Sequence, residues 1–264
     1  MEGSEDMTMQ TGFVILDSVV HRRHFPAPDT EVLPGLSWGA IESFPSPAYW
    51  AYQAWADEIQ PHPINYKLGS TLREEVGACL LGGHGIPASV GLAAFAHLKE
   101  LEVFSTALLT EAELFNCLSE PLQVNGKMIR YRFAKQKARY LHAALKALQS
   151  EDIPMQSGQA LRNWLLAIPG IGFKTASWIA RNWLDADDVA ILDIHILRAG
   201  ALGGFFSTGL SVERHYLQLE QEFLTFSRAL SVKASALDAL MWYQMMSASH
   251  VVHDLLDRAK LRAA

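Results

Sequence analysis

Cysteine is scarce in this sequence, and its scarcity excludes several kinds of protein. Only Cys79 and Cys117 occur among 264 residues. Two thiols are too few for a disulfide framework, a four-cysteine zinc site or an iron–sulfur cluster held by four thiolates. We expect both cysteines to be small buried apolar residues, and we expect no metal site.

Long apolar runs are also absent. No stretch approaches the roughly 20 apolar residues that cross a bilayer. The first six residues are acidic where a secretory signal would be basic. With half of its residues hydrophobic and 19% charged, the chain has enough apolar material for a folded core. We therefore predict a soluble cytoplasmic protein with no membrane association.

Acidic residues are missing from one segment, although they predominate in the chain as a whole. The net charge of −6 argues against wholesale wrapping of nucleic acid. Between Pro121 and Gln149, however, there is no Asp or Glu, and the cations of this segment are Lys127, Arg130, Arg132, Lys135, Lys137, Arg139 and Lys146. The segment is a candidate face for an anionic ligand. The alternative is a solvated helix face whose charges serve solubility.

The apolar pattern predicts a mainly α fold with an irregular N-terminal extension. Residues 1–60 are rich in proline and aromatic residues and contain one strand-like run, Phe13 to Val20. From about Leu68 onward the pattern is helical, with breaks at 82–87, Pro121 and Pro154. We expect two domains, an extension over 1–60 and a helical domain over 61–264.

The most informative stretch is 157–184. Apolar residues spaced i, i+3, i+4, i+7 predict two consecutive helices, one through Leu161, Trp164, Leu165 and Ile168 and one through Ala176, Ile179, Ala180 and Trp183. Between them, Gly170 and Gly172 allow a tight turn and a close backbone approach to a phosphate. The second helix would present its amides and positive dipole end there. The pattern predicts a helix-hairpin-helix; an ordinary αα-hairpin is the alternative.

Two residues near this hairpin could carry chemistry. Lys174 falls in the first turn of the second helix, where the dipole and partial burial favour the neutral, nucleophilic amine. Asp193 follows a run over 189–192 that we expect to be extended, and it precedes a helical pattern. The alternatives are a surface position for Lys174 and a simple helix cap for Asp193.

Together these residues resemble the helix-hairpin-helix DNA glycosylase superfamily. The resemblance is carried by Ile168-Pro169-Gly170-Ile171-Gly172-Phe173-Lys174-Thr175-Ala176 and Ala190-Ile191-Leu192-Asp193-Ile194-His195-Ile196-Leu197-Arg198. The Lys–Asp spacing is that of the bifunctional members. The details are most similar to the 8-oxoguanine DNA glycosylase/AP lyases, especially their compact archaeal-type branch, with further similarity at 130–133, 137–141, 176–182 and 237–243. The resemblance covers roughly 68–246 and implies a two-lobed helical fold.

The resemblance also implies a reaction. The target nucleotide is extruded from the duplex, the Lys174 amine attacks its sugar C1′, and the damaged base is released. The resulting Schiff base permits β-elimination, which nicks the strand. Asp193 would stabilise positive charge on the sugar and assist proton transfers. A nearby carboxylate would at the same time favour the charged amine and oppose the helix dipole.

Further site residues follow from the resemblance. The backbone of Gly170 and Gly172 would hold a phosphate, and relatives often bind a monovalent cation through the hairpin carbonyls; no other cofactor is expected. The remaining DNA-contact candidates are His195, Arg198, Arg132, Lys137 and His84, of which His84 lies in the loop where relatives carry duplex-invading residues. The candidates for the base pocket are Trp178, Trp242 and Asp238. The alternatives are core positions for the tryptophans and a structural imidazole for His195.

Two departures from the branch concern the substrate. The chain continues past the tryptophan helix to residue 264, so recognition of the base by a C-terminal lysine is not expected. The extension 1–60 matches neither the compact branch nor the β-rich N-terminal domain of the eukaryotic-type enzymes.

We predict a bifunctional glycosylase/AP lyase that acts on an oxidised purine, in first place 8-oxoguanine, in double-stranded DNA. One alternative is a glycosylase-like protein redeployed in an antiphage system of the type IV CBASS kind, with another modified base as target. The other is a non-catalytic helix-hairpin-helix DNA-binding module.

Overall fold

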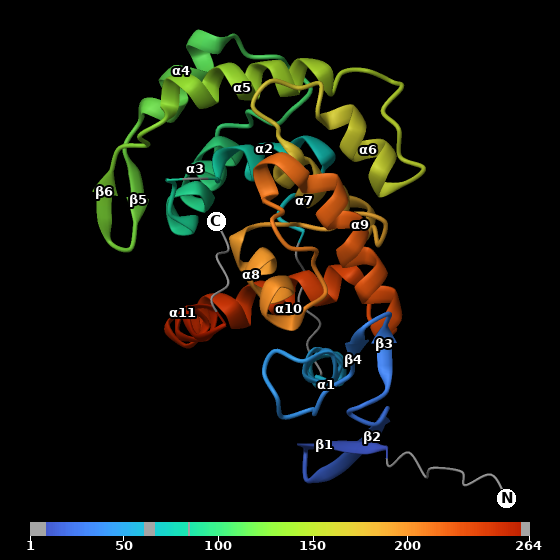
Figure 1. The fold of residues 1–264 in the computed structure, drawn as a ribbon. Helices are drawn as coiled ribbons and strands as arrows, with labels where there is room; N and C mark the ends of the chain where they lie inside the picture. Colours follow the sequence, from blue (N-terminus) through green and yellow to red (C-terminus); the bar gives the residue numbers. More distant parts are fainter. Residues whose placement is uncertain (1–8, 61–66, 84, 260–264) are drawn as a thin grey trace, which may run out of the picture. The chain divides into compact units, whose positions relative to one another are not determined.

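The computed structural model describes residues 9–60, 67–83 and 85–259, and it confirms the mainly α fold (Figure 1). The chain divides into two compact units, Met1–Ile64 with Ala190–Ala264 and Asn65–Val189. The N-terminal segment thus shares a unit with the C-terminal helices. The two predicted domains, an extension over 1–60 and a helical domain over 61–264, are parts that we expect to fold independently. This division stays a prediction.

Where the structure describes the unit Asn65–Val189, its regular elements are helices apart from one short β-hairpin. Its elements are α2 (Leu72–Leu81), α3 (Ala88–Glu100), α4 (Glu111–Ser119), β5 (Leu122–Val124), β6 (Lys127–Ile129), α5 (Ala134–Ala147), α6 (Gly158–Leu165) and α7 (Phe173–Leu184). Its core consists largely of fully buried leucines, among them Leu80, Leu98, Leu114, Leu141, Leu161 and Leu165. Cys79 belongs to this core, whereas Cys117 is only partly buried, so the expectation for the cysteines holds for Cys79 alone.

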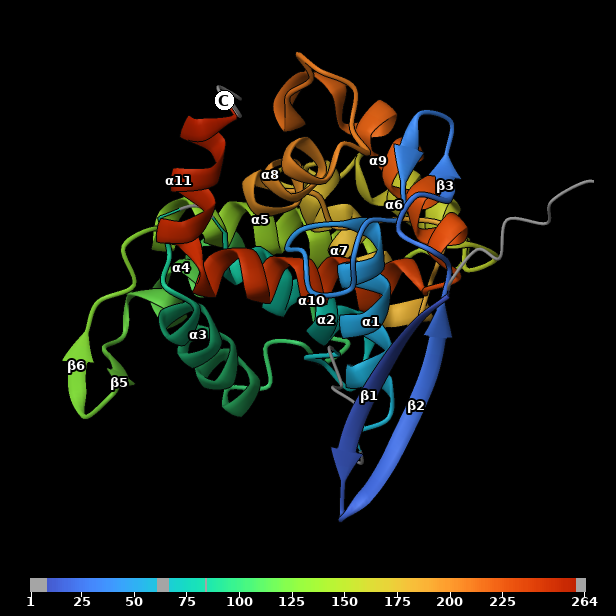
Figure 2. The ribbon, with the colours of Figure 1, turned by 60° about the horizontal axis from the view of Figure 1, so that its bottom comes forward.

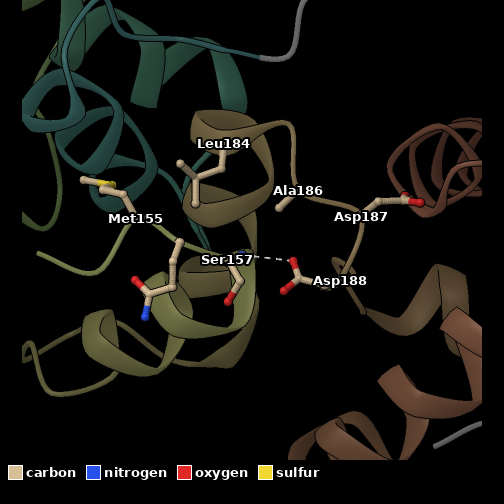
Figure 3. Close-up of a pocket in the computed structure, with 8 residues that line it drawn as sticks. Met155, Ser157, Leu184, Ala186, Asp187 and Asp188 are labelled. Atoms are coloured by element: carbon tan, nitrogen blue, oxygen red, sulfur yellow. Dashed lines mark hydrogen bonds between the residues drawn. The ribbon is translucent and has the colours of Figure 1, made fainter.

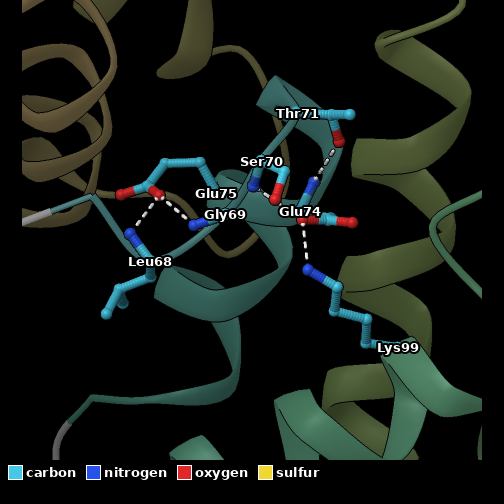
Figure 4. Close-up of polar contacts among 7 residues, drawn as sticks. All are labelled: Leu68, Gly69, Ser70, Thr71, Glu74, Glu75 and Lys99. Carbon is cyan, nitrogen blue, oxygen red and sulfur yellow. Dashed lines mark hydrogen bonds and ion pairs between the residues drawn. The ribbon is translucent and has the colours of Figure 1, made fainter.

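A buried carboxylate fixes the segment before α2. The side chain of Glu75 is fully buried and accepts the amides of Leu68 and Gly69, both at 2.7 Å (Figure 4). At the solvent side, Glu74 pairs with Lys99 at 2.9 Å. Because the Glu75 oxygens find donors, the carboxylate can be buried, and it ties residues 68–69 to the helix.

In its described residues, the second unit combines four short β-strands of the N-terminal segment with five helices. In chain order these are β1 (Gln10–Leu16), β2 (Val19–Phe25), β3 (Glu31–Leu33), β4 (Leu36–Ser37), α1 (Pro47–Glu58), α8 (Ile194–Gly203), α9 (Val212–Leu230), α10 (Ala234–Ser247) and α11 (Ser249–Arg258). Its core includes the fully buried rings of Trp50, Phe223 and Phe226, and Phe205 stacks on Phe226 with ring centroids 3.9 Å apart.

The N-terminal segment is not irregular, and the single strand expected over Phe13–Val20 is wrong. Asp17 and Ser18 have φ of 49° and 65°, the left-handed pair of a type I′ turn, so the run splits into the antiparallel hairpin β1–β2 (Figure 2). Later in the segment, Ser46 caps α1 and Pro47 begins it. Turn and cap chemistry therefore impose order on a stretch whose proline content indicates a loop.

None of the helices in the described part of the chain is long and apolar enough to cross a membrane.

Candidate active site

The structure confirms the helix-hairpin-helix. Helices α6 and α7 pack together and are joined by residues 166–172. Ser157 caps α6 through its hydroxyl, which accepts the amide of Ala160 at 3.0 Å. Gly170 has φ of +87°, a conformation that side-chain-bearing residues rarely adopt. The prediction that the turn requires glycine is therefore confirmed at residue 170.

A residue outside the motif decides the shape of this turn. A Cβ built on Gly170 would lie 2.3 Å from a ring carbon of Tyr140 on α5. The turn is thus packed directly against an aromatic ring, and glycine is required for space as well as for φ. Sequence reasoning missed Tyr140, because only the fold brings it to a residue thirty positions away.

Gly172 serves a different purpose. It is the N-cap of α7, has φ of −99°, and has no atom within 4 Å of its would-be Cβ. The cap supplies no side-chain hydrogen bond to the first turn of the helix. A helix N-terminus that has open space beside its cap residue and no capping side chain suits an anionic ligand.

Lys174 is the second residue of α7 and is exposed. The expected partial burial is therefore wrong: the amphipathic pattern buries Ala176, Ile179 and Ala180 and turns Lys174 away from that core. Exposure leaves the amine accessible to a large substrate.

Asp193 is the N-cap of α8, as predicted. Its Oδ1 accepts the amides of His195 at 2.8 Å and Ile196 at 3.3 Å. The carboxylate is thus held in one orientation by two backbone donors. Lys174 and Asp193 belong to different units of the structure. The catalytic roles expected for both stay predictions.

The other candidates on α8 and α10 share one unit. His195 and Arg198 are partly buried on α8. The imidazole of His195 meets the ring of Trp242 edge-on, with centroids 6.2 Å apart, and Trp242 is 43% exposed. An exposed indole beside an imidazole can accept a stacking base. Trp178 lies in the other unit, partly buried against the leucine core.

Asp238 has a structural task. It is 2% exposed, and its Oδ2 accepts the amide of Ile191 at 3.0 Å. Glu220 accepts the amide of Ala190 at 3.0 Å, and the hydroxyl of Tyr216 accepts the amide of Leu192 at 3.1 Å. The segment before Asp193 therefore forms no strand; side chains from α9 and α10 satisfy its backbone instead. Sequence reasoning missed Glu220 and Tyr216.

The structure disagrees with a DNA contact through Lys137. Its ammonium donates to the carbonyls of Leu80 and Gly82 at the C-terminal end of α2, at 2.5 and 2.9 Å. The hydroxyl of Tyr131 donates to the intervening carbonyl of Leu81. Burial lowers the pKa of Lys137 and raises that of Tyr131. Lys137 thus closes a helix end, where a cation is favourable.

Arg132 and His84 complete the predicted contacts. Arg132 is exposed, and its guanidinium lies 5.2 Å from the ring centroid of Phe133. His84 lies outside the described residues. In the described part of the chain, no group of three or more His, Cys, Asp or Glu side chains is arranged to hold a metal ion.

A shallow hollow of about 420 Å³ lies between residues 155–158 and 184–188 and contains none of the predicted site residues (Figure 3). Two acidic residues line it, Asp187 and Asp188, and Asp188 already accepts the amides of Gly158 at 3.0 Å and Gln159 at 3.1 Å. The carboxylate therefore caps α6, and we assign the hollow to the support of the hairpin.

The comparisons with known proteins agree with this geometry. A family model described as 8-oxoguanine DNA glycosylase matches residues 70–232. The 8-oxoguanine DNA glycosylase/AP lyase of Saccharolobus islandicus (strain Y.N.15.51) is 31% identical over 158 residues, which cover 53% of this chain and 75% of that protein. The protein of the same name from Methanocaldococcus jannaschii is 33% identical over 130 residues, covering 47% and 62%.

A solved structure is also similar. The crystal structure of Methanocaldococcus jannaschii 8-oxoguanine DNA glycosylase matches with a TM-score of 0.50 and 26% identity, covering 67% of this chain and 78% of that one. The fold and the lysine-bearing hairpin thus define a helix-hairpin-helix protein of the DNA glycosylase class. The chain belongs to the 8-oxoguanine DNA glycosylase family, because the family model matches more than half of its length. Its archaeal relatives confirm the resemblance to the archaeal-type branch.

Proposed function

We propose that this protein is a bifunctional DNA glycosylase/AP lyase that excises 8-oxoguanine from double-stranded DNA. The observation that carries the proposal is the placement of Lys174, exposed in the first turn of α7 directly after the open cap at Gly172, in a chain of this family. A phosphate at the cap would hold the strand while the amine reaches the sugar.

The proposed chemistry uses an amine and a carboxylate. The Nζ lone pair of Lys174 forms a bond to C1′ as the glycosidic bond breaks, and the base leaves with the bonding electrons and takes up a proton. The attached amine then loses a proton and its lone pair expels O4′, which takes up a proton, so the sugar ring opens to an iminium. The iminium acidifies the C2′ hydrogen, and removal of that hydrogen as a proton expels the 3′ oxygen with its phosphate and nicks the strand. Asp193, held by two amides, would stabilise the positive sugar and carry protons.

The remaining residues take supporting roles in this proposal. Gly170 and Gly172 bind a phosphate through the backbone, and Arg132, His195 and Arg198 contact further phosphates. Trp242 and Trp178 stack on the extruded base. We assign Asp238 to the scaffold of the site, since its buried carboxylate holds the segment that leads into Asp193.

A monovalent cation at the hairpin fits the donor set. The carbonyls of Ile168 and Gly172 each accept one backbone amide, at 3.1 and 2.9 Å. Each carbonyl oxygen keeps a second lone pair, and neutral oxygens without a carboxylate suit a weakly held ion of single charge. Such an ion would add positive charge beside the bound phosphate.

Two alternatives are less well supported. The relatives described above are named 8-oxoguanine DNA glycosylase/AP lyase, which favours an enzyme over a non-catalytic module and 8-oxoguanine over another base. No comparison supports an antiphage role. We place the enzyme in the cytoplasm, with damaged duplex DNA as its partner.

Borohydride trapping tests the proposal directly. Wild type and Lys174→Ala are incubated with duplexes that carry 8-oxoguanine, an abasic site or no lesion. We expect a trapped adduct with 8-oxoguanine and with the abasic site in wild type, and none in Lys174→Ala. An adduct only at the abasic site would refute 8-oxoguanine as the substrate. If no duplex gave an adduct, the proposed enzymatic activity would be refuted.

A further inference from the structure

The basic segment that precedes the hairpin carries a surface of unpaired positive charge. Six of its cations are exposed, and we call them the cationic face: Lys127, Arg130, Arg132, Lys135, Arg139 and Lys146. Among the described residues, none of these six forms an ion pair with a carboxylate. The segment from 121 to 149 itself contains no Asp or Glu. The positive field of this face is therefore uncompensated within its own segment.

Helical geometry arranges half of this face in a line. Lys135, Arg139 and Lys146 lie on α5 at intervals of four and seven residues, which places them on one side of the helix. At 1.5 Å per residue the line is roughly 16 Å long. The opposite side of α5 is buried through Ala138, Leu141 and Leu145. The cations thus form one exposed stripe and do not surround the helix.

The other half lies on β6 and the connection to α5. Asn125 and Gly126 have φ of 49° and 77°, which closes the tight hairpin β5–β6 and exposes Lys127 beside its tip. Arg132 and Arg139 each lie over the ring of the next residue, 5.2 and 5.3 Å from the centroids of Phe133 and Tyr140. These ring contacts hold both guanidinium groups at the surface.

The cationic face and the hairpin turn meet at Tyr140. The Tyr140 ring packs against Gly170, and the Arg139 guanidinium lies over the same ring. Both features belong to one compact unit. A strand whose phosphate sits at the hairpin turn can therefore continue directly onto α5.

From these observations we infer that the cationic face binds the phosphate backbone of duplex DNA beside the lesion, as an extension of the phosphate site at the hairpin. The inference rests on the proposed function, because it takes duplex DNA as the ligand. The contacts are to phosphates, so the face adds affinity for any sequence and does not select the base. Lys137 is excluded, since its ammonium is bound by two carbonyls.

The test compares neighbouring cations on one helix. The variant Lys135→Ala/Arg139→Ala removes two exposed charges of the cationic face. Lys137→Met removes one partly buried charge, and Lys135→Arg/Arg139→Lys exchanges the charges without removing them. Binding of each variant to lesion-free duplex and to single-stranded DNA of the same length is measured by fluorescence anisotropy at several salt concentrations. Circular dichroism checks that each variant is folded.

We expect Lys135→Ala/Arg139→Ala to bind duplex about tenfold more weakly, with the slope of log K against log salt reduced by about 0.9 for each lost phosphate contact. The charge-exchange variant and Lys137→Met should keep the wild-type slope.

Two results would overturn the inference. One is an unchanged duplex slope in Lys135→Ala/Arg139→Ala, including the case in which only single-stranded binding changes. The other is an equal loss of slope in Lys137→Met. The readout is binding to undamaged DNA, so it is independent of the trapping experiment. A wild type that binds duplex through this face but traps no lesion would refute the proposed function and leave the inference standing.

Discussion

Tyr140 and Gly170 are in direct contact, with the tyrosine ring where a side chain at residue 170 would have to lie. The contact joins α5 to the turn of the helix-hairpin-helix. Because the backbone of Gly170 also has φ of +87°, the turn depends on this glycine in two independent ways, through conformation and through space.

Gly170→Ala is expected to lower the free energy of unfolding by about 2–4 kcal/mol, since it combines left-handed strain with overpacking. Gly172→Ala is the matched control, because residue 172 has a negative φ and open space beside it. The control should stay within about 0.5 kcal/mol of wild type. Urea denaturation measures both, and equal losses in the two variants would contradict the role given to Tyr140.

Lys174→Gln is expected to abolish strand cleavage and to leave duplex binding and thermal stability near wild type. The residue is exposed on α7, so its substitution removes no packing. Gel analysis of cleavage and anisotropy of binding provide the two readouts. Cleavage at the wild-type rate in Lys174→Gln would show that another nucleophile acts.

The side chain of Asp193 caps α8 and carries a negative charge, and two variants separate these two properties. Asp193→Ala loses both, and we expect a loss of about 0.5–2 kcal/mol in unfolding free energy. Asp193→Asn keeps an oxygen for the amides of His195 and Ile196 and should be nearly as stable as wild type.

If the charge is catalytic, Asp193→Asn will be folded but slow in single-turnover cleavage of an 8-oxoguanine duplex. Wild-type rates in this variant would reduce Asp193 to its capping role.

Lys137→Met is expected to destabilise the fold by about 1–3 kcal/mol, because the carbonyls of Leu80 and Gly82 lose their donor. Burial lowers the pKa of Lys137 from 10.5 in the folded chain. At pH values between that lowered pKa and 10.5, Lys137 is protonated in a larger fraction of the unfolded chains than of the folded chains. The contribution of Lys137 to the free energy of unfolding therefore rises with pH in this window.

Urea midpoints of wild type and Lys137→Met, measured from pH 7 upward, should diverge as the pH enters this window, in favour of wild type. At pH values below this window, the urea midpoints of the two proteins should differ by a constant amount. Parallel midpoints up to pH 10.5 would show that burial does not perturb the ammonium.

Much of the hairpin was predictable, because its signals are local. Apolar residues at helical spacing, two glycines between two such patterns and an aspartate before a third pattern act over a few residues each. The structure accordingly confirms α6, α7 and the cap at Asp193. Local signals failed where a turn lies inside an apolar run, as at Asp17 and Ser18, since both residues there adopt a conformation that the pattern does not encode.

The sequence by itself therefore determined the mainly α fold, the helix-hairpin-helix, the position of Lys174 in the first turn of α7 and the cap at Asp193. Only the tertiary structure decided that Lys137 closes α2, that Asp238 supports the segment before Asp193, and that Tyr140 shapes the turn at Gly170. The physical reason is the range of the interactions. Helix patterns and caps join residues within one or two turns, whereas these three contacts join residues 30 to 57 positions apart, which only the packed chain brings together.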